Sequence, residues 1–162
     1  MLSQLEDAMN ETAQRQRILW VDDEPCILTV LKKLLECEGY EVHVAPSAAA
    51  AFDLMAEHEF ALVGTNIRMS PVNGLEMSQT IRRKYPTVPI MLVTCCSPSP
   101  EQVVASGAND LMSKPFRVQE LFRRISETIA RGSTRRSGFV QAMIHGQMDE
   151  YVRCVVAAFD GD

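Results

Sequence analysis

Five polar residues from four separate stretches of the chain could act together at one site. Asp22 and Asp23 follow the apolar run ILWV, and Asn66 lies two residues beyond the apolar run ALVG. Thr94 ends the apolar stretch PIMLVT, and Lys114 lies in the stretch SKPF. Two carboxylates, a hydroxyl and an ammonium group are typical of a site built around a further carboxylate, yet the central position holds the neutral amide of Asn66.

The elements that must position these residues alternate along the chain. Apolar runs of strand length are expected to form strands at 18–21, 42–45, 60–64, 89–94 and 109–113. Helical patterns follow them at 26–39, 47–58, 74–85, 101–107 and 117–130, and Ser47 is expected to cap the second helix. This alternation predicts an α/β fold, in which helices cover both faces of a parallel sheet. Sites in such sheets form beyond the carboxyl ends of the strands, where the five polar residues fall.

Composition narrows the class of protein. The chain has 162 residues and a net charge of −5, which argues against a general nucleic-acid binder. No stretch approaches the roughly 18 apolar residues of a membrane span, and the N-terminus lacks the blocks of a secretory signal. A Gly-rich phosphate loop and a Ser-His-Asp arrangement are also missing, so an enzyme is not predicted. The sequence predicts a cytoplasmic protein that binds neither a membrane nor nucleic acid directly.

The five cysteines form no metal-binding spacing, and their odd number indicates reduced thiols. The adjacent pair Cys95 and Cys96 can be interpreted as a redox sensor or as ordinary core packing. The frequency with which free cysteine is buried favours packing.

Residues 18–130 resemble a response-regulator receiver domain of bacterial two-component signalling. The stretches that carry the resemblance are ILWVDDEP, NIRMSPVNGLEM, PIMLVT and GANDLMSKPF, in the order that the family has them. The resemblance implies a flavodoxin-like fold of three layers, with a doubly wound five-stranded parallel sheet in the order 2-1-3-4-5. The receiver is expected over 17–130. It is preceded by an extension with a weak helical pattern (1–16) and followed by a linker (131–138) and an amphipathic helix (139–162).

The resemblance also implies roles for the polar residues. Asp22, Asp23 and the backbone carbonyl of Arg68 match the ligands of Mg²⁺, a hard cation that prefers oxygen. Thr94 matches the hydroxyl that turns toward a bound phosphoryl group, and Lys114 matches the cation that pairs with it. The peptide bond after Lys114 matches a cis bond of the family, which occurs almost only before proline.

Two departures from the family put its usual mechanism in doubt. The phospho-acceptor aspartate is replaced by Asn66, and a neutral amide is a poor nucleophile. Because one of three anionic ligands is lost, Mg²⁺ should bind weakly or not at all, and Lys114 is then expected to pair with the acidic residues. The switch position, which usually holds an aromatic residue, holds Leu111.

Two functions stay open. The first is a receiver-type signalling module of a phosphorelay or two-component pathway, a pseudo-receiver that contacts a histidine kinase or a downstream effector without being phosphorylated. The second is a conventional phospho-accepting, Mg²⁺-dependent response regulator whose acceptor aspartate was mutated to Asn66. In addition, the apolar stripe over 139–159 predicts a segment that packs in a homodimer or on its own receiver. The face around Leu111 is the expected acceptor surface.

Overall fold

The computed structural model of the protein describes residues 15–132. Strands and helices alternate through this range: β1 (Arg17–Val21), α2 (Pro25–Cys37), β2 (Glu41–Ala45), α3 (Ala48–Glu57), β3 (Leu62–Asn66), α4 (Gly74–Lys84), β4 (Ile90–Thr94), α5 (Pro100–Ser106), β5 (Asp110–Ser113) and α6 (Val118–Arg131). Apart from residues 15–16 and 131–132, the expected N-terminal extension, linker and C-terminal helix lie outside the described residues.

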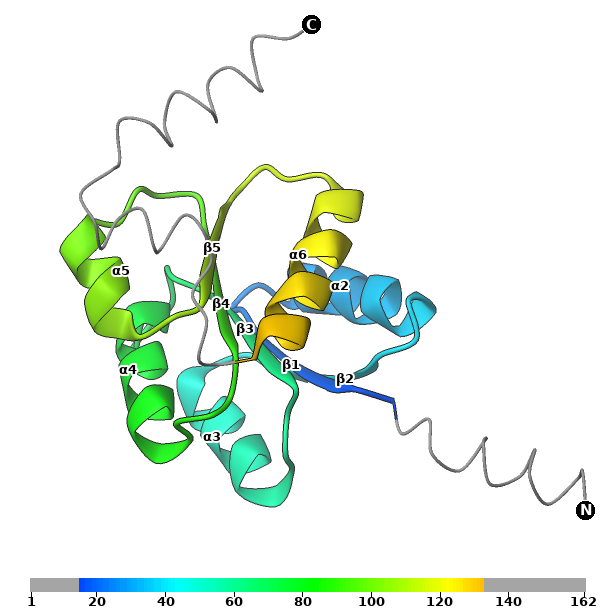
Figure 1. Cartoon of the computed structure of the whole chain (residues 1–162), viewed down its shortest axis with the longest axis horizontal. Coiled ribbons are helices and arrows are strands. Elements are labelled where there is room, and N and C mark those ends of the chain that lie inside the picture. Colours follow the sequence, from blue (N-terminus) through cyan, green and yellow to red (C-terminus); the bar gives the residue numbers. More distant parts are fainter. Residues whose placement is uncertain (1–14, 133–162) are drawn as a thin grey trace, which may run out of the picture.

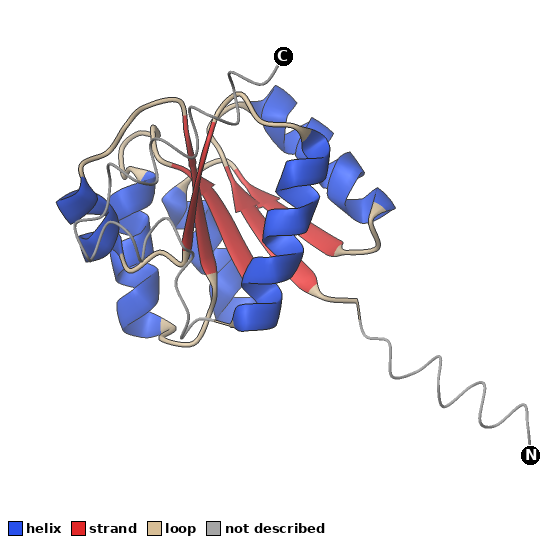
Figure 2. Cartoon of the chain, turned by 45° about the horizontal axis from the view of Figure 1, so that its top comes forward, coloured by secondary structure: helices blue, strands red, loops and turns tan. Residues whose placement is uncertain are grey.

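The five strands form one parallel sheet in the order β2-β1-β3-β4-β5, which confirms the predicted order. Helices α2 and α6 cover one face of the sheet, and α3, α4 and α5 cover the other (Figure 1). Figure 2 shows the strand arrows ending at the same edge of the sheet. Among the described residues, no helix is both long enough and apolar enough to span a membrane.

Each face of the sheet has its own apolar core. One cluster packs the inner faces of α3, α4 and α5 against the sheet and includes Met77, Ile81 and Leu111. The other packs α2 and α6 against the opposite face, around the fully buried Trp20. A side-chain carbon at Gly64 would lie 2.4 Å from the Trp20 ring, so this position on the neighbouring strand leaves room for the indole.

Side chains cap the starts of three helices that lead away from the sheet. As predicted, Ser47 caps α3, and its hydroxyl accepts a hydrogen bond from the Ala50 N–H at 3.2 Å. Helices α4 and α5 each begin with a capping box, in which the capping side chain and the third helical residue bond each other's backbone N–H groups. The capping residues are Asn73 and Ser99.

Strand β3 lies two residues later than the sequence predicts. The expected strand covered 60–64, whereas the observed one runs from Leu62 to Asn66. Asn66 is therefore the last residue of a strand and not part of the following loop. The Ile67 N–H continues the ladder by donating to the Val93 carbonyl at 3.0 Å, which fixes the backbone on the far side of Asn66.

A buried ion pair attaches α6 to β5. The Arg124 guanidinium binds the Asp110 carboxylate through two nitrogen atoms, one of them Nε at 2.8 Å. It also donates to the Leu111 carbonyl at 2.9 Å. Asp110 is almost completely buried, so Arg124 takes the place of the water that its carboxylate would otherwise contact, and the pair ties β5 to α6.

Candidate functional site

The strand register brings the predicted polar residues to one edge of the sheet. Val21 pairs with Thr65 across β1 and β3, so the residues that follow them, Asp22 and Asn66, lie at the same level. The carboxyl ends of β4 and β5 are aligned with each other in the same way. The residues brought to this edge are Asp22, Asp23, Asn66, Thr94 and Lys114.

Of the acidic pair, Asp22 is buried and Asp23 is exposed. The backbone N–H of Glu24 donates to Asp22 Oδ1 at 3.0 Å. Lys114 Nζ lies 3.4 Å from Asp22 Oδ2. The lysine therefore contacts the acidic pair, as expected for a site without the third carboxylate.

Asn66 is 6% exposed, and its side chain is directed at the loop that follows β3. Its Nδ2 atom donates a hydrogen bond to the Arg68 carbonyl at 3.0 Å. An ionised aspartate has no donor and could not make this bond. The Arg68 carbonyl, a predicted Mg²⁺ ligand, is thus engaged by the Asn66 amide.

The loop after β3 returns to its starting point through Gly74. The Gly74 N–H donates to the Ile67 carbonyl at 2.9 Å. A side-chain carbon at Gly74 would lie 2.2 Å from the Asn66 carbonyl oxygen, so a larger residue would push the start of α4 away from the strand end. The close approach of these two backbone segments fixes the shape of the loop.

Thr94 and Lys114 lie on the other side of Asn66, at the ends of β4 and β5. The Thr94 hydroxyl is buried and accepts a hydrogen bond from the Cys96 N–H at 2.9 Å. The Lys114 N–H donates to the Thr94 carbonyl at 2.7 Å. The bond between Lys114 and Pro115 is cis, as the resemblance implies.

Leu111, at the switch position, is 6% exposed and belongs to the apolar core beneath α3, α4 and α5. The expectation that it offers a permanently apolar surface for docking is therefore wrong for this side chain. Its size lets it pack inward, where it is covered by the core. The large hydrophobic side chains that are exposed within 15–132 are Val30, Val72 and Val118.

The residues present fit a Mg²⁺ site only in part. The candidate ligands are two carboxylates and one carbonyl, and the carbonyl of Arg68 and both oxygens of Asp22 already have partners in the protein. Within the part of the chain that the structure describes, no group of three or more His, Cys, Asp or Glu side chains could hold a metal ion. A hard cation at these oxygen atoms would compete with Lys114 and the Asn66 amide.

The cysteines correct another interpretation. The four cysteines within the described range are all exposed, so the interpretation of Cys95 and Cys96 as core packing is wrong. The strand pattern ends at Thr94, and the pair lies in the loop beyond it, where side chains face solvent. Arg68 Nη1 lies 3.8 Å from Cys96 Sγ, a contact that the sequence did not indicate.

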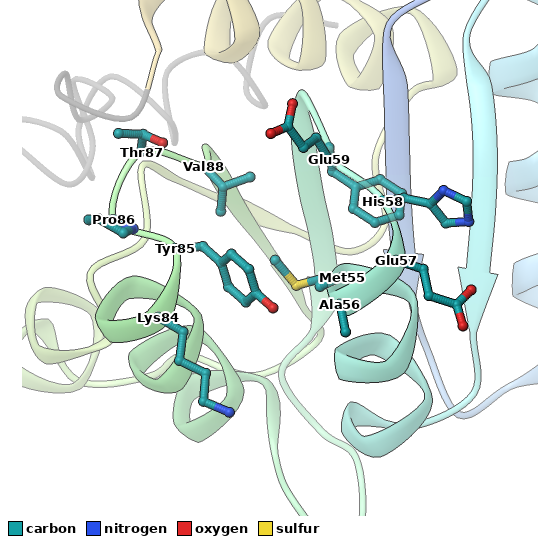
Figure 3. Close-up of a pocket in the computed structure, with 11 residues that line it drawn as sticks. Met55, Ala56, Glu57, His58, Glu59, Lys84, Tyr85, Pro86, Thr87 and Val88 are labelled. Atoms are coloured by element: carbon teal, nitrogen blue, oxygen red, sulfur yellow. The ribbon is translucent and has the colours of Figure 1, made fainter.

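A cavity of about 570 Å³ lies at the opposite, amino-terminal edge of the sheet. It is formed by the end of α3 and the turn between α4 and β4, and Figure 3 shows Met55 and Tyr85 facing each other across it. Phe60 and Val88, just before β3 and β4, also line it. The cavity is therefore separate from the polar edge that holds Asn66.

The fold and the polar edge define a receiver domain, and comparison with known proteins agrees. The sequence model of the response regulator receiver domain matches residues 18–126. The chain belongs to this family. It has the CheY-like fold, with a parallel sheet in the order 2-1-3-4-5.

Relatives and solved structures give the extent of the similarity. YkoG of Bacillus subtilis, an uncharacterised transcriptional regulatory protein, is 32% identical over 124 residues, which are 75% of this chain and 54% of the relative. A CheY-like receiver domain protein from Methanospirillum hungatei is 30% identical with a TM-score of 0.69, covering 73% of this chain and 96% of the other. The response regulator TrrA from Thermotoga maritima, solved in complex with Mg²⁺-BeF, is 33% identical with a TM-score of 0.63, covering 70% and 98%. The chain spans about half the length of the curated relatives that it matches.

Proposed function

We propose that this receiver domain works in a two-component or phosphorelay pathway through protein–protein contacts and without being phosphorylated. The observation that carries the proposal is the buried amide of Asn66 at the end of β3, bonded to the Arg68 carbonyl at 3.0 Å. A carboxylate at this position would be the nucleophile for a phosphoryl group, and an amide cannot form the acyl phosphate. Residues 67–73 contain no acidic side chain that could replace it.

The position of Lys114 supports the same conclusion. Lys114 Nζ lies 3.4 Å from the buried Asp22 carboxylate. A phosphoryl group would have to compete with this carboxylate for the lysine. This ion pair offsets the charge of Asp22 and leaves that of Asp23. We therefore propose that Mg²⁺ binds weakly at Asp22, Asp23 and the Arg68 carbonyl, or does not bind there, and that the domain needs no other cofactor.

The partners that we propose are other signalling proteins, a histidine kinase or a downstream effector. Contacts with them would be constitutive, because no phosphoryl group is available to change the surface. The domain itself would act in the cytoplasm and would not bind nucleic acid directly. The segment over 139–159, which lies outside the described residues, would add a homodimer contact through the apolar stripe of its sequence.

One observation favours a second candidate, the conventional receiver whose acceptor was mutated. Apart from Asn66, the residues that the resemblance assigns to phosphorylation lie at one edge of the sheet: Asp22 follows β1, Thr94 ends β4 and Lys114 follows β5. A single change to aspartate would then restore the reaction. Sequencing codon 66 of the source gene distinguishes the candidates, because an asparagine codon contradicts the second one.

The biochemical test compares three full-length proteins: the unchanged chain, Asn66→Asp, and Asn66→Gln as a control that keeps an amide. Each is incubated with acetyl phosphate and Mg²⁺, and its intact mass is measured. We expect a phosphoryl adduct on Asn66→Asp alone. An adduct on the unchanged chain would overturn the proposal. A folded Asn66→Asp protein that takes no phosphate would instead refute the second candidate.

A further inference from the structure

Two adjacent exposed thiols lie beside the candidate site. Cys95 and Cys96 follow Thr94 directly at the end of β4, and their sulfur atoms lie 4.0 Å apart. The hydrogen bond from the Cys96 N–H to the Thr94 hydroxyl, 2.9 Å long, ties the start of this loop to the strand end. The pair is therefore held at the edge of the sheet that carries Asn66.

A cation from another part of the chain faces this pair. Arg68 reaches across from the loop after β3, and its Nη1 atom lies 3.8 Å from Cys96 Sγ. The contact raises the pKa of the Arg68 guanidinium, chiefly through its hydrogen bond to Cys96 and secondarily through Cys95. The guanidinium places a positive charge beside the exposed Cys96 sulfur, where it would attract an anionic reagent.

Two other exposed cysteines can be compared with Cys96. Cys26 and Cys37, at the two ends of α2, are also exposed. Within residues 15–132, neither of these thiols has a hydrogen bond or ion pair to a cationic side chain. Exposure is thus shared by all four thiols, whereas a neighbouring cation and a neighbouring thiol are found together at Cys96.

We propose that Cys96 is a modification site that forms a mixed disulfide with a small disulfide bearing carboxylates, such as glutathione disulfide. The Cys96 thiolate attacks one sulfur of this reagent, so that a bond from Sγ to that sulfur forms and the S–S bond of the reagent breaks. The released thiolate takes a proton from water. Cys96 is oxidised and one sulfur of the reagent is reduced, so no further oxidant is required. Arg68, 3.8 Å from the sulfur, pairs with a carboxylate of the reagent and so holds its disulfide beside Cys96.

Cys95 does not readily displace the bound group. Attack by Cys95 on Cys96 would close a disulfide between neighbouring residues, whose Cα atoms lie only about 3.8 Å apart. Disulfides usually join Cα atoms separated by roughly 4.4 to 6.8 Å, and closer pairs are strained. The mixed disulfide on Cys96 therefore persists. This inference goes beyond the proposed function and does not depend on it, because the reaction is measured on the thiol itself.

The experiment follows all thiols of the full-length protein at once. Reduced protein is exposed to glutathione disulfide for increasing times, the remaining thiols are alkylated, and each cysteine is mapped by mass spectrometry. Cys95→Ser assigns the modification within the adjacent pair. We expect Cys96 to gain glutathione several-fold faster than Cys26 and Cys37. Arg68→Gln should lower the rate at Cys96 several-fold and leave the rates at Cys26 and Cys37 unchanged.

A second measurement needs no substitution. The advantage of Cys96 over Cys26 and Cys37 should shrink as salt is added, because exposed charges are screened. Equal rates at the three cysteines would overturn the proposal, as would an unchanged Cys96 rate in Arg68→Gln or a salt-independent advantage. If Cys95 and Cys96 both lose their thiols without gaining glutathione, they close a disulfide with each other and the persistent mixed disulfide is ruled out.

Discussion

Replacing Asn66 by aspartate should destabilise the metal-free protein, because it adds a second buried carboxylate beside Asp22. The two residues follow the paired positions Val21 and Thr65, so they lie at the same level on neighbouring strands. They are 1% and 6% exposed, and solvent can screen neither of them well. The change also removes the hydrogen bond that the Asn66 amide donates to the Arg68 carbonyl at 3.0 Å.

The size of the effect follows from this geometry. Neighbouring strands lie about 4.8 Å apart, and two charges about 5 Å apart repel by roughly 3 kcal/mol at an effective dielectric constant of about 20. The lost hydrogen bond costs about 1 kcal/mol. Lys114, which already lies 3.4 Å from Asp22, offsets part of the repulsion. We expect a net loss of about 2 to 3 kcal/mol in the free energy of unfolding.

Urea unfolding in EDTA and in Mg²⁺ measures this loss. Asn66→Ala is the matched control, because it removes the hydrogen bond without adding a charge. In EDTA, Asn66→Asp should be less stable than Asn66→Ala by about 1 to 2 kcal/mol. Mg²⁺ should raise the stability of Asn66→Asp by ligand linkage and leave the other two proteins nearly unchanged. The reasoning is refuted if both variants are equally stable in EDTA, or if Mg²⁺ stabilises all three proteins alike.

Three further predictions concern packing, pH and assembly. Gly64→Ala should cost about 2 kcal/mol or more in urea unfolding, because the added carbon would lie 2.4 Å from the Trp20 ring; a loss within experimental error would contradict this packing. The Arg17 guanidinium lowers the pKa of Glu41 from 4.5 to about 2. A lowered folded-state pKa stabilises the protein above the unfolded-state value, and this contribution is lost as the pH falls from 4.5 to about 2. Glu41→Gln should therefore be less stable than the unchanged protein at neutral pH, with a difference that narrows through that window; a difference independent of pH would count against the pairing. Ending the chain after Arg131 should lower the molar mass measured by light scattering from that of a dimer to that of a monomer, and two monomers of equal stability would exclude a packed tail.

The hydrophobic pattern of the sequence predicts the order of strands and helices well, because strands buried on both faces must be apolar throughout. It predicts the limits of β3 poorly. Phe60 is apolar because it packs in the core, although it lies ahead of the paired residues, whereas Thr65 and Asn66 are polar and yet paired. Burial and strand pairing are separate properties, and an apolar pattern reports only the first.

The sequence predicts which residues lie at the polar edge and that Lys114 pairs with the acidic residues, but it does not predict the contacts between loops. Order along the chain identifies which positions end the strands, and the parallel sheet then brings them together. The contact of Arg68 with Cys96 joins residues 28 apart in sequence and depends on how two loops fold over the sheet edge. The rings of His43 and His58, which are isolated in the sequence, likewise lie 4.8 Å apart. No periodicity encodes such contacts between residues far apart in the sequence.

Gly74 gives the loop after β3 a closure that is made by backbone atoms. The turn is closed by backbone atoms, through the bond from the Gly74 N–H to the Ile67 carbonyl and the tight fit against the Asn66 carbonyl. The backbone closure of this loop and the side chain at position 66 can therefore change separately. A protein that recognises the backbone around Gly74 would meet the same contacts with an amide or a carboxylate at position 66, although the hydrogen bond to the Arg68 carbonyl would be lost with the carboxylate.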